Sequence, residues 1–468
     1  YRPYLSAEAS VGQEIEPLGT KTSISGATLK VLDTGEWLTT RLKTTDLNLA
    51  LARKRVRLLL GLTGLQESEY QPVFSGAIAD YGYENRAYTL RLGDHYFAAK
   101  VRQQTAKTTL QAAWTTGVST TLKIPTNVYV LNAEDVAVNG YLRVDSDILK
   151  FTGDTNDSAT AYQLDGAVDG QFSTTAANHA NAAVAEELWV DDGTHPLTIA
   201  LRLLLSDAGS AATGAYDIYS EVTYTGSAAS TRTFRRRGLG MSPTDVAVGE
   251  IESLRDNKFA GYQFRLFVEE PIADLKDFVE REILRPLGCY FVTKSDGRLS
   301  IASHKIPAAA DVVYMIDPSQ CSRPEWRIAH DDIVNYLSSE YDWNPATKEY
   351  DGQYLATDAT SAATYGLRKR EGTFRGVDGA YASTTILDNW KTDIFARFKD
   401  PYITVEVTCG LYESLVEIGD AVYFTHMELP NVSTGLRGIV EQKWQVVGRR
   451  FDLRAGRTTL TLADVSRA

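Results

Sequence analysis

The sequence predicts a mainly β, multi-domain protein with a minor α+β portion. The chain has 468 residues, which at about 150 residues per domain indicates about three domains. Its 25 Tyr occur with Thr, Val and Phe in short runs between Gly, Asp and Asn turns, a composition typical of strands. The apolar fraction of 43% and the charged fraction of 23% are those of a globular chain and exclude wholesale disorder.

Short strand-like runs extend over most of the chain. In Tyr402–Thr408, alternate residues face opposite sides of the strand, as expected for a half-buried sheet. Nine runs predict strands: Arg55–Leu60, Val73–Ile78, Ala87–Leu92, Tyr262–Val268, Val334–Tyr341, Tyr402–Thr408, Ala421–Thr425, Trp444–Phe451 and Thr458–Leu462.

Three segments predict helices. Ile272–Leu287 places apolar residues at three- and four-residue spacing, and Pro286-Leu287-Gly288 ends it. The other two are Leu197–Ser206 and Thr384–Phe398.

The composition shifts twice along the chain. Lys107–Leu188 is rich in Ala, Thr, Asn and Asp, which predicts a small inserted β module with little apolar area to bury, placed at the periphery. The polar stretch Asp342–Thr364 predicts a long exposed hairpin. The domains that we predict are 1–106, 107–190, 191–315 and 316–468.

The charge and cysteine content restrict the possible functions. With 48 Lys+Arg against 60 Asp+Glu, the net charge of −12 argues against wrapping nucleic acid by charge neutralisation. Cys289, Cys321 and Cys409 contain no Cys-x-x-Cys pair, so we expect small buried thiols in a protein folded in a reducing compartment, not a disulfide framework. No apolar run approaches the ~20 residues of a membrane span, and no signal peptide is visible.

The sequence carries no recognisable catalytic or cofactor motif. The six His are scattered, there is no Gly-x-Ser-x-Gly elbow, and Gly238-Leu239-Gly240 lacks the residues that complete a phosphate loop. We therefore expect no enzyme activity, no cofactor, and no catalytic or metal-binding residue.

One charge cluster is a candidate contact site. Arg232, Arg235, Arg236 and Arg237 lie within seven residues. In a chain of net charge −12, an acidic neighbouring subunit is favoured over nucleic acid as the partner, and a solvated loop is the alternative.

Four stretches, taken in order, resemble the tail-tip (baseplate) hub proteins of long-tailed bacteriophages and of gene transfer agents. The first resembles paired strands of the first hub barrel, and the second a small module common in phage tail proteins, with Asp147 where that pattern has Glu. The third resembles the helix, strand and hairpin of the hub, and the fourth its second barrel. The stretches are Phe74–Asp80 with Tyr88–Asp94, Gly140–Gly153 with Thr174–Ala180, Ile272–Ser300, and Asp332–Asp342 with Tyr365-Gly366, Leu415–Val422 and Trp444–Phe451.

The resemblance implies two β-barrel-like tube domains, a small inserted β module and a helix-containing domain. It implies a non-enzymatic structural protein of the virion tail tip, synthesised in the host cytoplasm and forming a homotrimeric hub ring. The implied partners are the distal tail protein ring, a central fibre or tip protein and the tape-measure protein, with DNA passing through the centre during genome ejection without specific binding. The Arg232–Arg237 cluster is then expected away from the passage.

Two other functional classes compete with this interpretation. A receptor- or carbohydrate-binding tail protein is the main alternative, because 25 Tyr and seven Trp offer faces on which sugars stack. A cell-wall-degrading enzyme would need an additional domain with its own catalytic signature, and the sequence shows none.

Overall fold

The computed structural model describes residues 5–15, 22–33, 36, 39, 54–61, 65–93, 107–125, 140–156, 161–205, 223–225, 231–233, 239, 241–269, 272–304, 306–410, 412–431, 434–452 and 455–465. These residues form several sheets and a few helices, which confirms the predicted mainly β, multi-domain class. Within these ranges, no helix is both long and apolar enough to cross a membrane.

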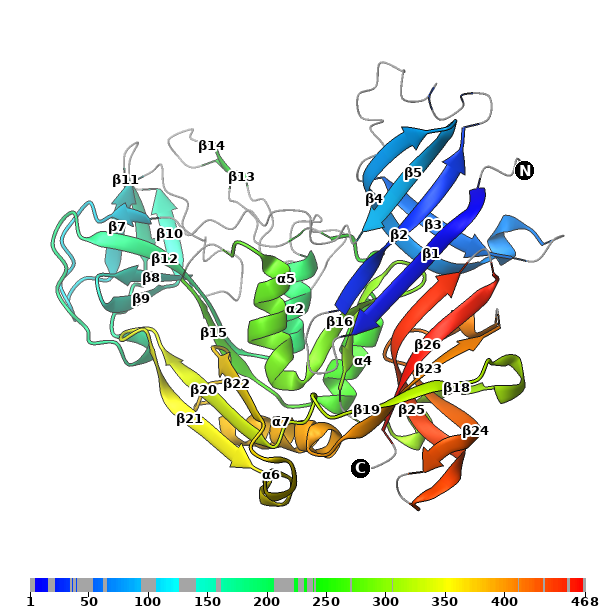
Figure 1. The fold of residues 1–468 in the computed structure, drawn as a ribbon. Helices are drawn as coiled ribbons and strands as arrows, with labels where there is room; N and C mark the ends of the chain where they lie inside the picture. Colours follow the sequence, from blue (N-terminus) through cyan, green and yellow to red (C-terminus); the bar gives the residue numbers. More distant parts are fainter. Residues whose placement is uncertain are drawn as a thin grey trace.

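An eleven-stranded sheet joins the two ends of the chain. Five of its strands come from the first 93 residues: β1 (Leu5–Ile15), β2 (Thr22–Leu32), β3 (Arg55–Leu60), β4 (Gln71–Glu84) and β5 (Ala87–Gly93). Six come from the C-terminal region: β18 (Val312–Ile316), β19 (Glu325–Ala329), β23 (Tyr402–Cys409), β24 (Ala421–Asn431), β25 (Leu436–Asp452) and β26 (Arg457–Asp464). The order is β19-β23-β26-β25-β1-β2-β5-β4-β3, with β18 attached through β24. The strands of the two expected barrels are thus connected, because β1 pairs with β25, as Figure 1 shows.

Strand β25 contributes to three separate apolar cores. Trp444 and Val446 pack in the core of the C-terminal strands. Val447, on the opposite face, packs in the large central core, and Phe451 packs in the core of the N-terminal strands. Residues 444 to 449 are all buried, so this part of the strand is covered on both faces.

Helices fill the centre of the molecule between its two ends (Figure 1). They are α2 (Pro196–Leu205), α4 (Val248–Lys258), α5 (Leu275–Val279) and α7 (Ser383–Phe398). Helix α5 continues into the π-helical turn η5 (Glu280–Leu284) and the 3-10 turn η6 (Arg285–Leu287). The hairpin of β16 (Cys289–Thr293) and β17 (Leu299–Ser303) lies beside these helices. The segment predicted from Ile272 begins at Leu275, because the Asp274 carboxylate caps it by accepting from the Asp277 amide at 3.1 Å. No helix was predicted at α4, in which Ile251 is the one buried residue.

A three-stranded sheet packs below these helices, in the order β21-β20-β22. Its strands are β20 (Tyr336–Asn344), β21 (Glu349–Thr357) and β22 (Lys369–Phe374), with α6 (Ala359–Tyr365) between the last two. The hairpin predicted within Asp342–Thr364 is formed by β20 and β21, and the remainder of that stretch is α6.

The predicted inserted module contains β6 (Lys107–Thr109), β7 (Thr121–Pro125), β8 (Gly140–Val144), β9 (Asp147–Phe151), β10 (Gly153–Asn156), β11 (Ala161–Asp165) and the first part of β12 (Val184–Thr194). The expectation of little buried apolar area is wrong, because eleven buried residues, including Trp114, Ile124 and Phe151, form a core of its own. Small residues dominate the composition, yet eleven apolar residues are buried together, while Val118, Val168 and Val184 are exposed.

Strand β12 connects this module to the helical centre. It pairs with β8 through Ala185–Leu188 and then with β15 (Phe264–Val268) through Trp189–Thr194. A second core cluster, containing Tyr141 of β8 and Phe267 of β15, is shared between the two regions. The short pair β13 (Thr223–Thr225) and β14 (Thr231–Thr233) forms a separate ribbon.

The cysteines differ from the expectation. Cys289 is free and buried, as predicted, but Cys321 and Cys409 form a disulfide, so the prediction of three free thiols is wrong. The two lie 88 residues apart in the sequence. They meet because the segment before β19 runs beside the end of β23, where the Ser322 amide donates to the Thr408 carbonyl at 2.7 Å.

We expect reduction of the Cys321–Cys409 disulfide to lower the free energy of unfolding by about 2–4 kcal/mol, because the bond closes a long loop in the unfolded chain. Urea denaturation with and without dithiothreitol measures this difference. The double variant Cys321→Ser/Cys409→Ser is the control and should be insensitive to reductant. Equal stability of the wild-type protein in both conditions would contradict the prediction.

Candidate functional site

The predicted arginine cluster is only partly described. Arg232 lies in β14, where its backbone pairs with Tyr224, and its side chain is outside the described residues. Arg235, Arg236 and Arg237 also lie outside them. The inter-subunit role of this cluster therefore stays a prediction, and the structure points to other places where polar side chains converge.

Arg449 forms hydrogen bonds between the N- and C-terminal strands of the eleven-stranded sheet. Its side chain is buried within β25, although the sequence places it in a strand-like apolar run. Nη1 donates to the carbonyls of Ser414 and Val416 at 3.1 and 3.0 Å, and Nη2 donates to the carbonyl of Val73 in β4 at 2.8 Å. One guanidinium thus ties the C-terminal strands to a residue 376 positions away. Burial lowers the pKa of this guanidinium, while Glu417 and Asp420 oppose that shift.

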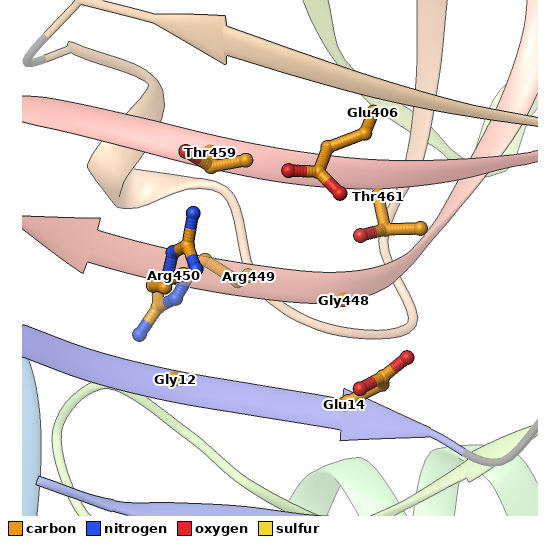
Figure 2. Close-up of a pocket in the computed structure, with 8 residues that line it drawn as sticks. All are labelled: Gly12, Glu14, Glu406, Gly448, Arg449, Arg450, Thr459 and Thr461. Atoms are coloured by element: carbon orange, nitrogen blue, oxygen red, sulfur yellow. The ribbon is translucent and has the colours of Figure 1, made fainter. Parts of the chain in front are cut away.

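A polar depression of about 240 Å³ lies over this junction. Residues of β1, β23, β25 and β26 line it, among them Glu14, Glu406, Arg450 and Thr461, which Figure 2 labels. Arg450, Glu14 and Glu406 are exposed, so charges of both signs face solvent across the point where the N- and C-terminal strands meet.

A buried histidine, His179, joins two segments of the inserted module. The His179 ring lies between two carboxylates, with Nδ1 at 3.0 Å from Asp145 and Nε2 at 3.2 Å from Asp147. Asp147 is fully buried and also accepts from the amides of Gly170 and Ala177 at 2.9 and 3.2 Å. The two halves of the second resembling stretch, Gly140–Gly153 and Thr174–Ala180, meet at these contacts.

A second buried network connects the module to the three-stranded sheet. Arg143 of β8 forms an ion pair with Glu269 at 3.0 Å and donates to the Pro345 carbonyl at 2.7 Å. The indole of Trp343 donates to the other Glu269 oxygen at 3.0 Å. Burial is the largest single influence on the Glu269 carboxyl and raises its pKa. Hydrogen bonds from Arg143 and Trp343, together with the charges of Arg143 and Arg375, outweigh burial, so the pKa is lowered. The module is thus bound to its neighbours by a desolvated charge pair as well as by apolar contacts.

The contacts of Arg449, His179 and Arg143 join segments that lie far apart in the sequence. Across the described part of the chain, no group of three His, Cys, Asp or Glu side chains is placed to hold a metal ion. Both ring nitrogens of His179 are in contact with carboxylates. Asp147, His179, Arg143 and Arg449 all lie in stretches that carry the resemblance, but no structural role was predicted for any of them from the sequence. A charged residue inside an apolar strand pattern is the signal that could have found Arg143 and Arg449.

No protein-family model matches the chain, and no curated protein matches it. Among solved structures, it is similar to a tail protein from Neisseria meningitidis MC58, with 10% identity over 98% of this chain and 92% of that chain and a TM-score of 0.38. It is similar to the 43 kDa tail protein of prophage MuSo2 from Shewanella oneidensis, with 9% identity over 98% and 95% and a TM-score of 0.34. A chain in the virion of a native gene transfer agent particle is 12% identical over 89% and 83%, with a TM-score of 0.32. At TM-scores below 0.5, these similarities establish neither the fold nor the function of this chain.

We expect Arg449→Met to lower the free energy of unfolding by about 3 kcal/mol, because three buried carbonyls lose their donor. The neighbouring Arg450→Met is a matched control and should change it by less than about 0.5 kcal/mol, since that side chain is exposed. Urea denaturation of both variants measures the difference. Similar losses in the two variants would refute a special role for Arg449.

Asp147→Asn should destabilise the protein by about 2–3 kcal/mol, because one of the two carboxylate oxygens becomes an NH₂ donor and either the Gly170 or the Ala177 amide loses its acceptor. Asp145→Asn should cost less than about 1 kcal/mol, as that side chain is 58% exposed. Thermal unfolding monitored by circular dichroism compares the two. An equal effect of both changes would show that the buried acceptor is not what orders the module.

Proposed function

We propose that this chain is a non-enzymatic structural subunit of a phage-type tail tip. In this proposal, three copies form the hub ring between the distal tail protein ring above and a central fibre or tip protein below. The tape-measure protein and DNA pass through its centre. The observation that carries the proposal is the eleven-stranded sheet, whose edge strands β19 and β3 each pair with one described strand, and whose strand β19 carries exposed apolar side chains.

The edges of the sheet provide surfaces for assembly. Among the described strands, β19 pairs with β23 alone, and its residues Trp326 and Ile328 are 48% and 42% exposed. At the other end of the path, β3 pairs with β4 alone. An open strand edge with apolar side chains favours pairing with a strand of another chain. In a closed ring, each subunit can cover such an edge of its neighbour by this pairing.

The charge fits a passage for DNA. Three copies of a chain with net charge −12 carry −36 in total. Acidic or neutral walls repel phosphate and leave a hydrated gap, whereas Lys or Arg contacts to the backbone would retain the DNA. We therefore propose that the residues lining the axis are acidic or polar and that the Arg232–Arg237 cluster lies elsewhere.

Receptor or carbohydrate binding ranks second. In the described part of the chain, the aromatic side chains among the exposed large hydrophobics are Tyr83, Trp326 and Tyr412, on three different elements. A sugar-stacking platform needs such rings close together. Binding of the purified protein to a glycan array would favour this alternative over the hub.

We expect the purified chain to form a trimer of 51.6 kDa subunits. Trp326→Arg should shift the mass toward the monomer, because a charge is placed on the apolar edge of β19. Mass photometry measures the distribution, and circular dichroism confirms that the variant is folded. Tyr412→Arg, at a residue 76% exposed in the 3-10 turn Tyr412–Leu415, is the control and should stay trimeric. A wild-type monomer, or a folded Trp326→Arg variant that remains trimeric, would contradict the proposal.

A further inference from the structure

The inner face of β22 carries an arginine next to a glycine. Alternation along the strand places Arg370, Gly372 and Phe374 on one face. Phe374 is fully buried against the Trp390 ring of α7, with centroids 5.0 Å apart, which identifies this face as the one turned toward the helices. Arg370 therefore projects from the same side, at the edge of the three-stranded sheet.

A second arginine occupies the space above Gly372. A Cβ atom at Gly372 would lie 3.6 Å from Cζ of Arg285, so the guanidinium rests over the glycine. Nη2 of Arg285 donates to the Glu371 carbonyl at 2.5 Å, which fixes it against β22. The two guanidinium groups are thus brought to one short stretch of strand from η6 and β22.

Polar atoms at this place have no protein partner. Nη1 of Arg370 is buried without a hydrogen-bond acceptor, and so is the hydroxyl of Ser339. The register of β20 and β22 pairs Ser339 with Gly372, directly beneath Arg285. In the described part of the chain, neither Arg285 nor Arg370 forms an ion pair.

The charged forms of Arg285 and Arg370 repel each other in a partly buried place. Burial and the neighbouring Arg285 lower the pKa of Arg370 to about 10. The negative charge of Glu282 raises the pKa of Arg285, against the larger lowering effect of burial. The Glu282 oxygens, however, already accept hydrogen bonds from Arg281 Nε at 2.8 Å and from the Arg375 amide at 3.2 Å. Two like charges that share a partly desolvated site are stabilised when an anion bridges them.

We propose that Arg285 and Arg370, together with the Ser339 hydroxyl, form a binding site for one oxyanion, a phosphate or a carboxylate. Guanidinium groups present paired N–H donors that match the oxygens of either group, and the hydroxyl adds a further donor. The site lies on β22, which is an edge strand of the three-stranded sheet and pairs with β20 alone among the described strands. This inference is independent of the proposed tail function.

The test is thermal unfolding of the full chain in phosphate, in acetate and in chloride at matched ionic strength. We expect phosphate or acetate to raise the midpoint by about 3 °C over chloride, since a ligand that binds the folded state stabilises it. Arg370→Met should abolish this rise. Arg368→Met, which changes an exposed arginine two residues away, should retain it.

The pattern of responses identifies the ligand class. A rise in phosphate alone assigns a phosphate site, and a rise in acetate alone assigns a carboxylate site for an acidic side chain. If Arg370→Met fails to fold, Arg285→Lys provides the second variant, because the change keeps the charge but loses the paired donors and should reduce the rise. Equal midpoints of the wild-type protein in all three salts, or an unchanged rise in a folded Arg370→Met variant, would overturn the proposal.

Discussion

The pairing of β1 with β25 is the contact on which the rest of the structure depends. It converts two groups of strands at opposite ends of the sequence into one sheet. Arg449 reinforces it, because its guanidinium satisfies carbonyls on both sides of the junction and water cannot replace it there. Since β25 also contributes side chains to three cores, a shift of this strand would disturb all of them at once.

The helical centre connects this sheet to the opposite end of the molecule. Strand β12 leaves the inserted module and enters the centre without a break, and the Arg143–Glu269 pair anchors the module to the β20–β21 hairpin. Desolvated ion pairs contribute little net stability but tolerate few alternative geometries. The module is therefore held in one orientation relative to the β20–β21 hairpin.

The sequence predicted most of the local structure and little of its assembly. Runs such as Arg55–Leu60 and Tyr402–Thr408 became strands, because alternation and β-branched or aromatic content act locally. The junction could not be predicted, since the register of β1 on β25 arises between residues more than 400 positions apart. The disulfide was missed for the same reason, and Arg370 gave no signal because its neighbour Arg285 comes from a different element.

The proposed function follows from a rigid sheet with open edges and from an acidic net charge suited to repelling DNA. Electron cryomicroscopy of the tail tip of the particle that carries this chain tests it most directly. The account predicts three copies around the tail axis, with strand edges covered by neighbouring chains and no arginine cluster projecting into the passage. A single copy, a position away from the axis, or a ring of Arg232, Arg235, Arg236 and Arg237 in the passage would contradict it.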